Sequence, residues 1–571
     1  MSKPVGFGVG TTAGLLAIGM MFLIRYAFGV PAAPELIQDS IVQLFPGEVA
    51  SQIIDRLQKS AKLLLFATVL LVQLGVLGLF GMWSAGPLGA GGGRLRPIEA
   101  AATWLRRPWE SPVIWGLLWW ILVVAVLFPN AGLGFSGSAT SNGAMVTALA
   151  SLGPPLTFVL GLMFGRAIIE TSFSRSPYQT DGSQQAAIGR RRFLGLSLAA
   201  VVGTIVGGNL VKLATAGQDS PGAPLALSSA DTRLNLPPTP TPTVIGHPGT
   251  PGVPDSGMPK KAPTPTPSPL PSGIIHPDTV PGISSELTSN KDFYVVSKNV
   301  IDPTVSVSRW RLKVEGLVDA PFQLTYDELR ALPAVSQFTT LICISNPVGG
   351  PLISNAKWTG VPLRVLLERS RLKPGVKDIA LFAADGYSDS IPLEKALEPT
   401  TLVAYGMNDE LLPSSHGAPA RLVVPGIYGM KNVKWLTGIE PVDEDFKGFW
   451  ERRGWSDIAV IKTMSRMDVP DSRLVVPGRN GIGGVAFAGD RGISQVQWSV
   501  DDASWKTAVV KPSLSPFSWV LWADEWEPKE SGVIRLRVRA IDGTGAVQTM
   551  DIAESFPDGT SGYHGVTVRV R

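Results

Sequence analysis

The 571-residue sequence has a single cysteine, Cys343, and only four histidines, the first of which is His247. One cysteine excludes an intrachain disulfide framework, a four-cysteine zinc site and an iron–sulfur cluster held by this chain alone. The absence of histidine before residue 247 also excludes a bis-histidine haem within that part of the chain.

Charged side chains are scarce as well. Asp, Glu, Lys and Arg make up 17% of the residues, and 50 basic side chains against 46 acidic ones give a net charge of only +4. So small an excess gives no reason to expect a nucleic-acid partner. The mean hydropathy of +0.20 is high for a soluble enzyme and indicates that part of the chain lies in lipid.

Long apolar runs predict an all-α membrane domain at residues 1–217, with about five transmembrane helices. Each run is close to the roughly 20 residues that a bilayer-spanning helix needs. Arg25, near the end of the first run, is expected to be an interface anchor that reaches toward water. The runs lie at 5–29, 62–83, 112–129, 144–168 and 193–216.

Arginine and lysine are sorted between the connections of these runs. The connections 84–111 and 166–192 are rich in arginine, whereas 130–143 carries no charge. The positive-inside rule therefore predicts a cytoplasmic N-terminus and, after an odd number of spans, an extracytoplasmic remainder. The RRRFL run at 190–194 resembles a twin-arginine export signal, although its arginines could instead only mark the cytoplasmic end of a span.

Residues 218–283 form a predicted Pro/Thr-rich linker, with runs such as APTPTPSPLPS. A segment of this composition cannot bury enough apolar surface to fold, and proline stiffens it toward polyproline II. We expect a semi-rigid spacer that holds the following domain away from the bilayer.

Two soluble domains are predicted after the linker. Residues 284–465 alternate β-branched runs with helical patterns, among them 325–332, where Thr325 is an N-cap with Glu328 three residues on, and 361–371. We expect an α+β domain there. Residues 466–571 contain only repeated strand patterns separated by turns, which predicts an immunoglobulin-like β-sandwich.

Two sets of residues could carry chemistry. Cys343 lies at the end of an apolar strand that leads into a glycine-rich turn. A lone cysteine in such a strand is usually a core residue, but it can also supply one thiolate to a metal whose other ligands come from a cofactor. His416, Arg421 and Lys434 at loop–strand junctions suit a phosphate-bearing cofactor, the alternative being ordinary surface cations.

Six segments in a fixed order identify a family. They are DFY (292–294), WRLKVEG (310–316), Cys343 with NAKWTGVPL (355–363), HGAPAR (416–421), VKWL (433–436) and FWERR (449–453). In this order they resemble the sulfite oxidase family of molybdenum-cofactor enzymes, which includes the methionine sulfoxide reductase catalytic subunits. The resemblance covers about 290–571, and the strand-rich tail resembles the family's dimerisation domain, which would make the protein a homodimer.

The resemblance implies roles for seven residues. Cys343 would be the protein thiolate on molybdenum, with the molybdopterin dithiolene supplying two more sulfurs. The remaining candidates for binding molybdopterin are Tyr294, Asp385, His416, Arg421, Asn432 and Lys434. The implied reaction is oxygen-atom transfer at a sulfur or nitrogen oxide centre of a small-molecule substrate, with electrons exchanged with a cytochrome, a quinone or a haem membrane subunit.

Two departures from the family pattern concern the substrate. Val348 stands where sulfite oxidases have the arginine that holds sulfite, and Trp455 stands where they have a tyrosine. The pocket is therefore expected to be more apolar, and its substrate to differ from sulfite. Lys357, Arg452 and Arg453 are the cations that could still bind an anion.

The predicted function is a membrane-anchored extracytoplasmic molybdenum oxidoreductase. The main alternative is a cofactor-free binding or surface protein that retains the fold, and a cysteine hydrolase is a third. The presence of Cys343 favours the enzyme, because a chain that had lost the cofactor would not need the metal ligand.

Overall fold

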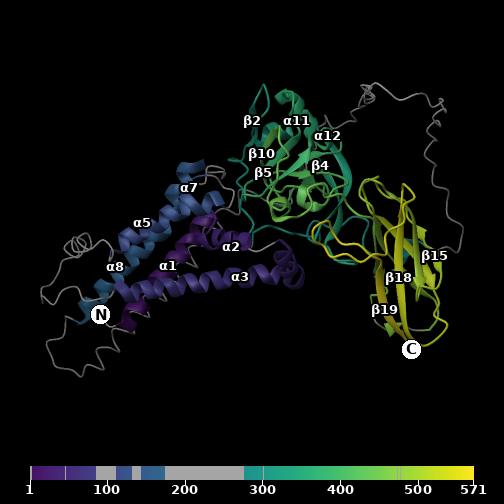
Figure 1. Cartoon of the computed structure of the whole chain (residues 1–571), viewed down its shortest axis with the longest axis horizontal. Coiled ribbons are helices and arrows are strands. Elements are labelled where there is room, and N and C mark those ends of the chain that lie inside the picture. Colours follow the sequence, from purple (N-terminus) through teal and green to yellow (C-terminus); the bar gives the residue numbers. More distant parts are fainter. Residues whose placement is uncertain are drawn as a thin grey trace.

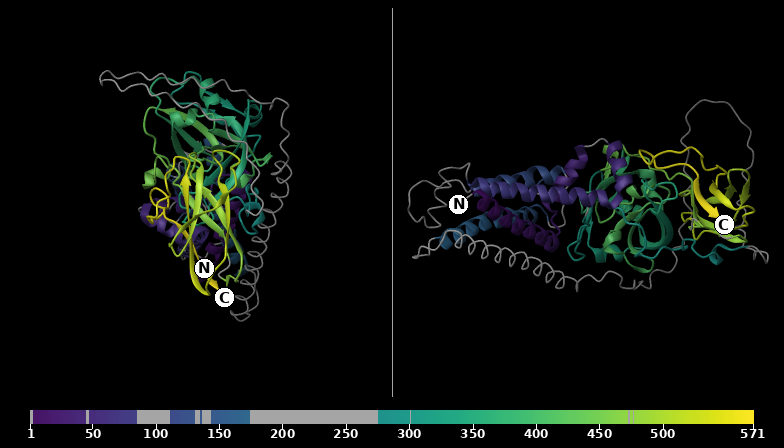
Figure 2. Two further views of the ribbon diagram at one scale, coloured as in Figure 1. Left: turned by 90° about the vertical axis from the view of Figure 1, so that its right-hand side faces the viewer. Right: turned by 90° about the horizontal axis from the view of Figure 1, so that it is seen from below.

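The computed structural model describes residues 3–44, 47–84, 111–130, 135, 143–173, 275–299, 301–471, 474–475 and 477–571. Its parts follow one another along the long axis: a helical part that contains the N-terminus, a mixed α/β part, and a β part that contains the C-terminus (Figure 1). The view from below, in the right panel of Figure 2, shows the same order.

Four helices of the N-terminal part are long and apolar enough to cross a membrane, which agrees with the first four predicted spans. They are Val5–Arg25, Leu63–Trp83, Pro112–Asn130 and Ala144–Gly165. The fifth predicted span, 193–216, and most of both arginine-rich connections lie outside the described residues. The helical elements are α1 (Lys3–Phe28), α2 (Ala33–Leu44), α3 (Gly47–Ser84), α5 (Pro112–Leu122), a π-helical stretch (Val123–Leu127), α6 (Phe128–Asn130), α7 (Gly143–Ser151) and α8 (Gly153–Phe173).

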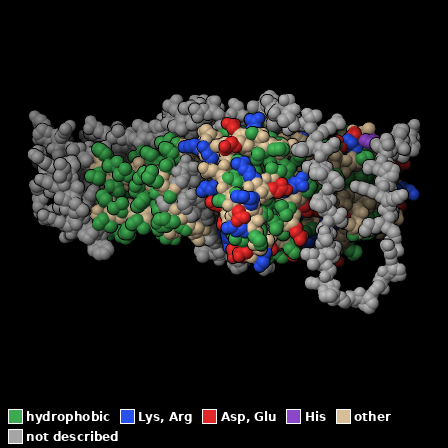
Figure 3. Space-filling view, turned by 90° about the horizontal axis from the view of Figure 1, so that it is seen from above, with side chains coloured by type: hydrophobic (Ala, Val, Ile, Leu, Met, Phe, Trp, Pro, Cys, Tyr) green, Lys and Arg blue, Asp and Glu red, His purple; other side chains and the backbone are tan. Residues whose placement is uncertain are grey.

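The surface and the packing of these helices fit a lipid environment. Apolar side chains cover the visible face of the helical part, whereas charged side chains gather over the α/β part (Figure 3). Helices α1 and α3 approach closely at Gly10 and Gly81, where an added Cβ on Gly10 would lie 2.7 Å from the Gly81 Cα. The π-helical stretch precedes Pro129, whose ring cannot sit beside the carbonyl four residues earlier in a regular helix.

The α/β part contains two sheets that hold the pocket between their ends. One sheet has the order β2-β1-β10-β5-β6, and the other has the order β3-β4-β7-β8, with β9 paired to β7. The first sheet is formed by β1 (Leu312–Val314), β2 (Phe322–Leu324), β5 (Asp378–Ala383), β6 (Ser388–Pro392) and β10 (Leu436–Val442). The second is formed by β3 (Val335–Ile342), β4 (Ile353–Pro362), β7 (Leu402–Met407), β8 (Glu410–Leu411) and β9 (Arg421–Val423).

Both predicted helices of this part are present. Helix α10 (Tyr326–Arg330) begins with a capping box in which the Thr325 hydroxyl accepts from the Glu328 amide and the Glu328 carboxylate accepts from the Thr325 amide. Helix α11 (Leu363–Ser370) lies within the predicted 361–371, and a third helix, α12, spans Leu393–Leu397. Leu363, Leu366 and Leu367 of α11 are fully buried, which explains why its apolar spacing was readable in the sequence.

The C-terminal part consists of two sheets around one core. The orders are β11-β13-β17-β16 and β12-β19-β18-β14-β15, and Trp498, Trp522 and Leu536 are among the side chains that fill the space between them. The immunoglobulin-like character of this part stays a prediction. Its strands are β11 (Met464–Val469), β12 (Leu474–Val475), β13 (Asn480–Phe487), β14 (Ile493–Val500), β15 (Trp505–Thr507), β16 (Val509–Val510), β17 (Val520–Trp526), β18 (Gly532–Asp542) and β19 (His564–Val570).

The end of the predicted linker packs against this C-terminal part. Residues 275–283 include a short 3-10 helix (Pro277–Thr279), and Val280 is buried beside Gly481. This stretch packs because it contains apolar side chains that can be buried, unlike the Pro/Thr runs before it. They are Ile275, Val280 and Ile283. The linker before residue 275 lies outside the described residues.

The helical part contacts the α/β part directly. The linker had been expected to hold the α/β part away from the bilayer. Arg25 is buried, and its Nε lies 2.9 Å from Oε1 of Glu35 on α2. Its Nη2 donates to the carbonyl oxygens of Ile301 (3.0 Å) and Asp302 (3.3 Å). The expected interface anchor is therefore a buried ion pair that joins α1, α2 and the segment leading into the pocket.

Replacing Arg25 by methionine should loosen this contact. The carboxylate of Glu35 would stay buried while the cation beside it is lost, an arrangement that costs about 3–5 kcal/mol. We expect a lower melting temperature in detergent and faster hydrogen exchange at the amides of Ile301, Asp302 and Thr304. The double variant Arg25→Met/Glu35→Met should recover most of the stability, and unchanged exchange in the single variant would show that the contact does not hold the two parts together.

Candidate active site

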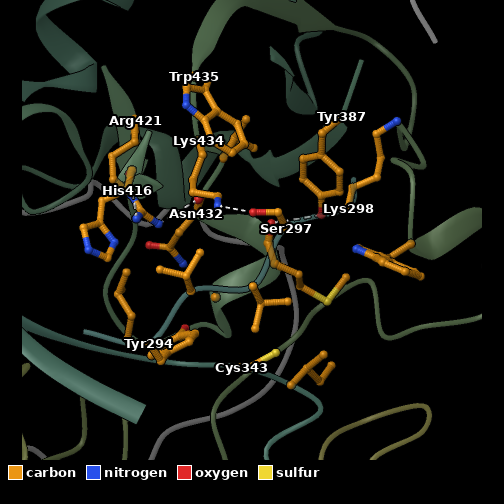
Figure 4. Close-up of a pocket in the computed structure, with 18 of the residues that line it drawn as sticks. Tyr294, Ser297, Lys298, Cys343, Tyr387, His416, Arg421, Asn432, Lys434 and Trp435 are labelled. Atoms are coloured by element: carbon orange, nitrogen blue, oxygen red, sulfur yellow. Dashed lines mark hydrogen bonds between the residues drawn. The ribbon is translucent and has the colours of Figure 1, made fainter. Parts of the chain in front are cut away.

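One pocket of the α/β part brings together all seven predicted site residues. They are Tyr294, Cys343, Asp385, His416, Arg421, Asn432 and Lys434. The pocket encloses about 1010 Å³, its open mouth included. Figure 4 shows the basic residues on one side, Cys343 on another, and Tyr387 with Lys298 opposite the basic side.

The basic end is built where loops enter β9 and β10. His416 ends a 3-10 helix (Ser414–His416), and its Nε2 lies 2.6 Å from the Asn290 carbonyl oxygen, so Nε2 carries the proton and Nδ1 is an acceptor. Burial and the charges of Arg421 and Lys434 lower the pKa of His416 to about 4. The ring is therefore neutral at physiological pH.

Arg421 is the buried cation of this end. Its guanidinium is 5% exposed and donates to the carbonyl oxygens of His416 (3.1 Å), Asn432 (3.0 Å) and Leu422 (3.3 Å). Burial lowers the pKa of Arg421 to about 10, which leaves it charged at neutral pH. Its guanidinium also lies 5.0 Å from the centre of the Trp358 ring, and among the described residues no carboxylate forms an ion pair with it.

Asn432 and Lys434 lie on the same turn before β10. The Asn432 side chain accepts from the Val424 amide (2.7 Å) and donates to the Tyr428 carbonyl oxygen (3.1 Å), so it fixes the turn. The Lys434 ammonium donates to the Ser297 hydroxyl (2.7 Å) and lies 4.2 Å from the centre of the Trp435 ring. The ammonium therefore faces the segment that closes the pocket.

Cys343 forms the opposite end, directly after β3. Its sulfur lies 3.2 Å from the Ser345 hydroxyl, and its backbone amide donates to the Leu352 carbonyl oxygen (3.0 Å). Within the described part of the chain, no three His, Cys, Asp or Glu side chains are close enough to hold a metal ion. A metal at Cys343 would therefore need most of its ligands from a cofactor.

Tyr294 and Asp385 complete the predicted set. Burial and the charge of Cys343 raise the pKa of Tyr294, and the charge of Arg421 opposes this, which places the phenol between the two ends of the pocket. An added Cβ on Gly429 would lie 2.6 Å from the Tyr294 hydroxyl oxygen, so the phenol fits only beside a glycine. Asp385 accepts from the Tyr387 amide (3.0 Å) and shapes the β5–β6 turn.

Sequence reasoning missed the side chains on the third side of the pocket. Tyr387, Trp450 and Lys298 line it, and Trp450 lies edge-on to Trp455, with ring centres 6.3 Å apart. The Lys298 ammonium lies 5.0 Å from the centre of the Phe449 ring. The sequence offered one signal for Tyr387. It follows Asp385 and Gly386 directly, and neighbouring residues of a turn that borders a pocket often line it together.

The cations named as substitutes for the missing arginine do not line this pocket. Lys357 pairs with Asp409 (2.7 Å), Arg452 donates to the Lys447 carbonyl oxygen, and Arg453 donates to the Phe449 carbonyl oxygen. Val348 lies in a smaller cavity on the other side of Cys343, whereas Trp455 lines the main pocket. The main pocket is therefore apolar at Trp455, as expected from the sequence. Lys298 is a cation on the same side of that pocket.

Comparison with known proteins shows the family of the chain. Residues 299–450 match the family described as "Oxidoreductase molybdopterin binding domain". The chain is 35% identical over 149 residues to "Uncharacterized oxidoreductase YuiH" of Bacillus subtilis, covering 26% of this chain and 73% of that protein. It is 30% identical over 316 residues to "Sulfite oxidase, mitochondrial" of Drosophila melanogaster, covering 46% of this chain and 55% of that protein. The chain belongs to the sulfite oxidase family of molybdopterin oxidoreductases.

A further relative of this family carries a different name. The chain is 34% identical over 152 residues to the "Putative protein-methionine-sulfoxide reductase subunit YedZ1" of Azospira oryzae, covering 27% of this chain and 56% of that protein. It thus spans about half of both the sulfite oxidase and the sulfoxide reductase subunit. Membership of the sulfite oxidase family makes the protein an oxidoreductase and disfavours a cofactor-free binding protein.

The residues present fit the molybdenum cofactor that the family implies. The pocket combines one thiol, at Cys343, with a buried guanidinium that has no carboxylate counterpart among the described residues. A phosphate-bearing cofactor that supplies its own sulfur ligands satisfies both ends at once.

Proposed function

We propose that the pocket holds molybdopterin with its molybdenum on Cys343 and its phosphate near Arg421 and Lys434. The observation that carries this proposal is that buried Arg421, which forms no ion pair with a carboxylate among the described residues, lies in a pocket that also contains the chain's only thiol. Neutral His416 would accept a hydrogen bond from a pterin N–H through Nδ1. Tyr294, Asp385 and Asn432 would shape the pocket around the ring system.

The bound cofactor would supply oxygen-atom transfer with a two-electron change at the metal. The chain's own residues would orient and enclose it. Arg421 and Lys434 would fix the phosphate end, while Trp450 and Trp455 would limit the entry of water from the opposite side. The Tyr387 hydroxyl, which hydrogen-bonds to Asp389, would exchange a proton with the substrate oxygen.

We further propose that the pocket lies outside the cytoplasm and exchanges electrons with a separate carrier, a quinone or a haem protein. Two observations support this. The α/β part lies at the end of the helices opposite the N-terminus (Figure 1), and the sequence rules predict a cytoplasmic N-terminus. The first 246 residues contain no histidine, so a haem with two histidine ligands would have to belong to a partner.

Reporter fusions test the orientation. A reporter fused after Gly217 should be active only outside the cytoplasm, and one fused near Gly92 only inside it, because the arginine-rich connections remain on the cytoplasmic side. The reverse pair of signals would place the pocket in the cytoplasm.

The proposed substrate is a neutral sulfur or nitrogen oxide rather than sulfite. Trp455 adds apolar surface to the pocket, and Val348, in the smaller cavity beside Cys343, supplies no cation that could hold an anion. The test compares kcat/KM for a neutral sulfoxide with that for sulfite, using artificial electron carriers and the purified full chain. We expect the sulfoxide to be favoured, and an efficiency for sulfite about 10²-fold above every neutral substrate would contradict the proposal.

A further inference from the structure

A cluster of buried charges lies behind the Tyr387 side of the pocket. The Lys431 ammonium lies 3.0 Å from Oδ1 of Asp389 and 2.6 Å from Oε1 of Glu451. These side chains are only 2%, 0% and 1% exposed. Asp389 comes from β6, Lys431 from a 3-10 helix (Gly429–Lys431), and Glu451 from another (Glu451–Arg453), so three separate elements supply the cluster.

Tyr387 connects this cluster to the pocket. Its ring lines the pocket, and its hydroxyl lies 2.6 Å from Oδ2 of Asp389 and 3.0 Å from the Met430 carbonyl oxygen. A hydroxyl can accept a proton on its oxygen while it gives up its own, so it can pass protons without ionising. Burial and the charges of Asp389 and Glu451 raise the pKa of Tyr387, which keeps the phenol protonated.

The cluster contains one more carboxyl group than its cations balance. Asp457, 39% exposed, lies 3.5 Å from Lys431 but pairs at 2.7 Å with Lys447. Asp389 and Glu451 are therefore left to share the single charge of Lys431. Burial, the charge of Asp389 and the hydrogen bond with it raise the pKa of Glu451 to about 8, so Glu451 holds a proton at neutral pH.

The other titratable groups around the cluster add to this acidic excess, since Lys447 pairs with Asp445 at 2.6 Å as well as with Asp457. Asp378 on β5 is buried in part, and burial raises its pKa. Hydrogen bonds to Lys447 and the charge of Lys431 lower the pKa of Asp457, which keeps it ionised. The remaining groups that face the cluster are Asp385 on the β5–β6 turn and Asp445 and Lys447 on the segment after β10.

Oxygen-atom transfer needs protons as well as electrons. Reduction of an oxide substrate XO follows XO + 2 H⁺ + 2 e⁻ → X + H₂O, with the electrons supplied by a reduced quinol or haem carrier. We propose that the Asp389–Glu451 pair stores a proton and delivers it to the pocket through Tyr387. This inference rests on the proposed function. It favours reduction of the substrate, because a carboxyl pair that holds a proton at neutral pH can donate that proton. The second proton comes from water, and half-exposed Asp457, 3.5 Å from Lys431, marks the side of the cluster that water reaches.

The first test measures the stored proton without turnover. Infrared titration of the purified full chain should show the carbonyl stretch of a protonated carboxylic acid that disappears as pH rises through about 8 and shifts in heavy water. Glu451→Gln should lack this band. Asp542→Asn, which alters an equally buried acid paired with Arg491 in the C-terminal part, should keep it. A Glu451→Gln spectrum that keeps the band would overturn the proposal.

Thermal unfolding gives a second readout with a defined sign. In the unfolded chain Glu451 loses its proton near pH 4.5, whereas in the folded chain it keeps it up to about pH 8. The folded state therefore binds more protons in this window, and stability should fall as pH rises from 4.5 to 8. Glu451→Gln should show a flatter dependence, and an identical dependence in both proteins would contradict the proposal.

The third test measures turnover with a neutral sulfoxide and an artificial electron donor. Tyr387→Phe and Glu451→Gln should lower kcat by about 10²-fold or more with little change in KM and a larger solvent isotope effect. Added small buffer acids should partly restore Glu451→Gln, whereas Asp542→Asn should keep the wild-type isotope effect. Turnover that Glu451→Gln leaves unchanged would overturn the proton store alone. Absence of turnover in the wild type would overturn the proposed function, and the role of the store with it.

Discussion

Replacing Cys343 by serine should abolish turnover while leaving the fold intact. Cys343 is the only cysteine of the chain, so no other side chain can supply a thiolate to the metal. An alkoxide or hydroxyl oxygen is a harder ligand and changes the electronic properties of the metal. The loss should exceed the roughly 10–100-fold effect that follows from removing an outer-sphere partner of a metal site.

The matched control for this prediction is Ser345→Ala. Its hydroxyl lies 3.2 Å from the Cys343 sulfur and can donate a hydrogen bond to it, so its removal should lower the rate without abolishing it. Both variants should retain the wild-type far-ultraviolet circular dichroism. Full turnover by Cys343→Ser would mean that the thiolate does not bind the metal.

Replacing Arg421 by alanine should empty the pocket of cofactor. A charge-assisted hydrogen bond to phosphate contributes about 1.5–3 kcal/mol, which corresponds to a loss of roughly 10–150-fold in affinity. The guanidinium also donates to three backbone carbonyl oxygens, so the cofactor-free chain should become somewhat less stable too. We expect the amount of bound pterin per chain to fall strongly. The melting temperature of the fraction that still holds the cofactor should change little.

Arg421→Lys separates charge from geometry. Lysine keeps the positive charge but cannot donate to three carbonyl oxygens and a phosphate at once, so occupancy should be intermediate. Arg311→Ala, which alters an arginine that donates to the nearby carbonyl oxygens of Ser308 and Trp310, should leave pterin content unchanged. If Arg421→Ala kept its pterin and simply unfolded at a lower temperature, Arg421 would be structural.

Local patterns predicted much of the fold. The four described spans, the capping box at Thr325 and the long strands of the C-terminal part follow from residue periodicity and cap chemistry, which act between neighbours in the sequence. The seven site residues share one pocket because each lies at a strand end or in an adjoining loop. Their positions in the sequence followed from the resemblance to the sulfite oxidase family, whereas spacing alone left a core cysteine and surface cations as alternatives.

Contacts between distant segments could not be predicted in this way. Arg25 was expected at the lipid–water interface, but its partners at Glu35 and 301–302 become visible only when the two parts of the molecule meet. Asp389 and Glu451 read as ordinary polar residues in the sequence. The fold turns them into a buried acidic pair by placing both against one lysine.

The metal and pterin content of the purified full-length chain tests the central claim most directly. Molybdenum would be determined by elemental analysis, and the pterin by fluorescence after its release and oxidation, both against protein concentration. We expect one molybdenum and one pterin per chain, with molybdenum bound through sulfur. A chain that is folded, is produced in cells able to make the cofactor, and contains neither molybdenum nor pterin would contradict it.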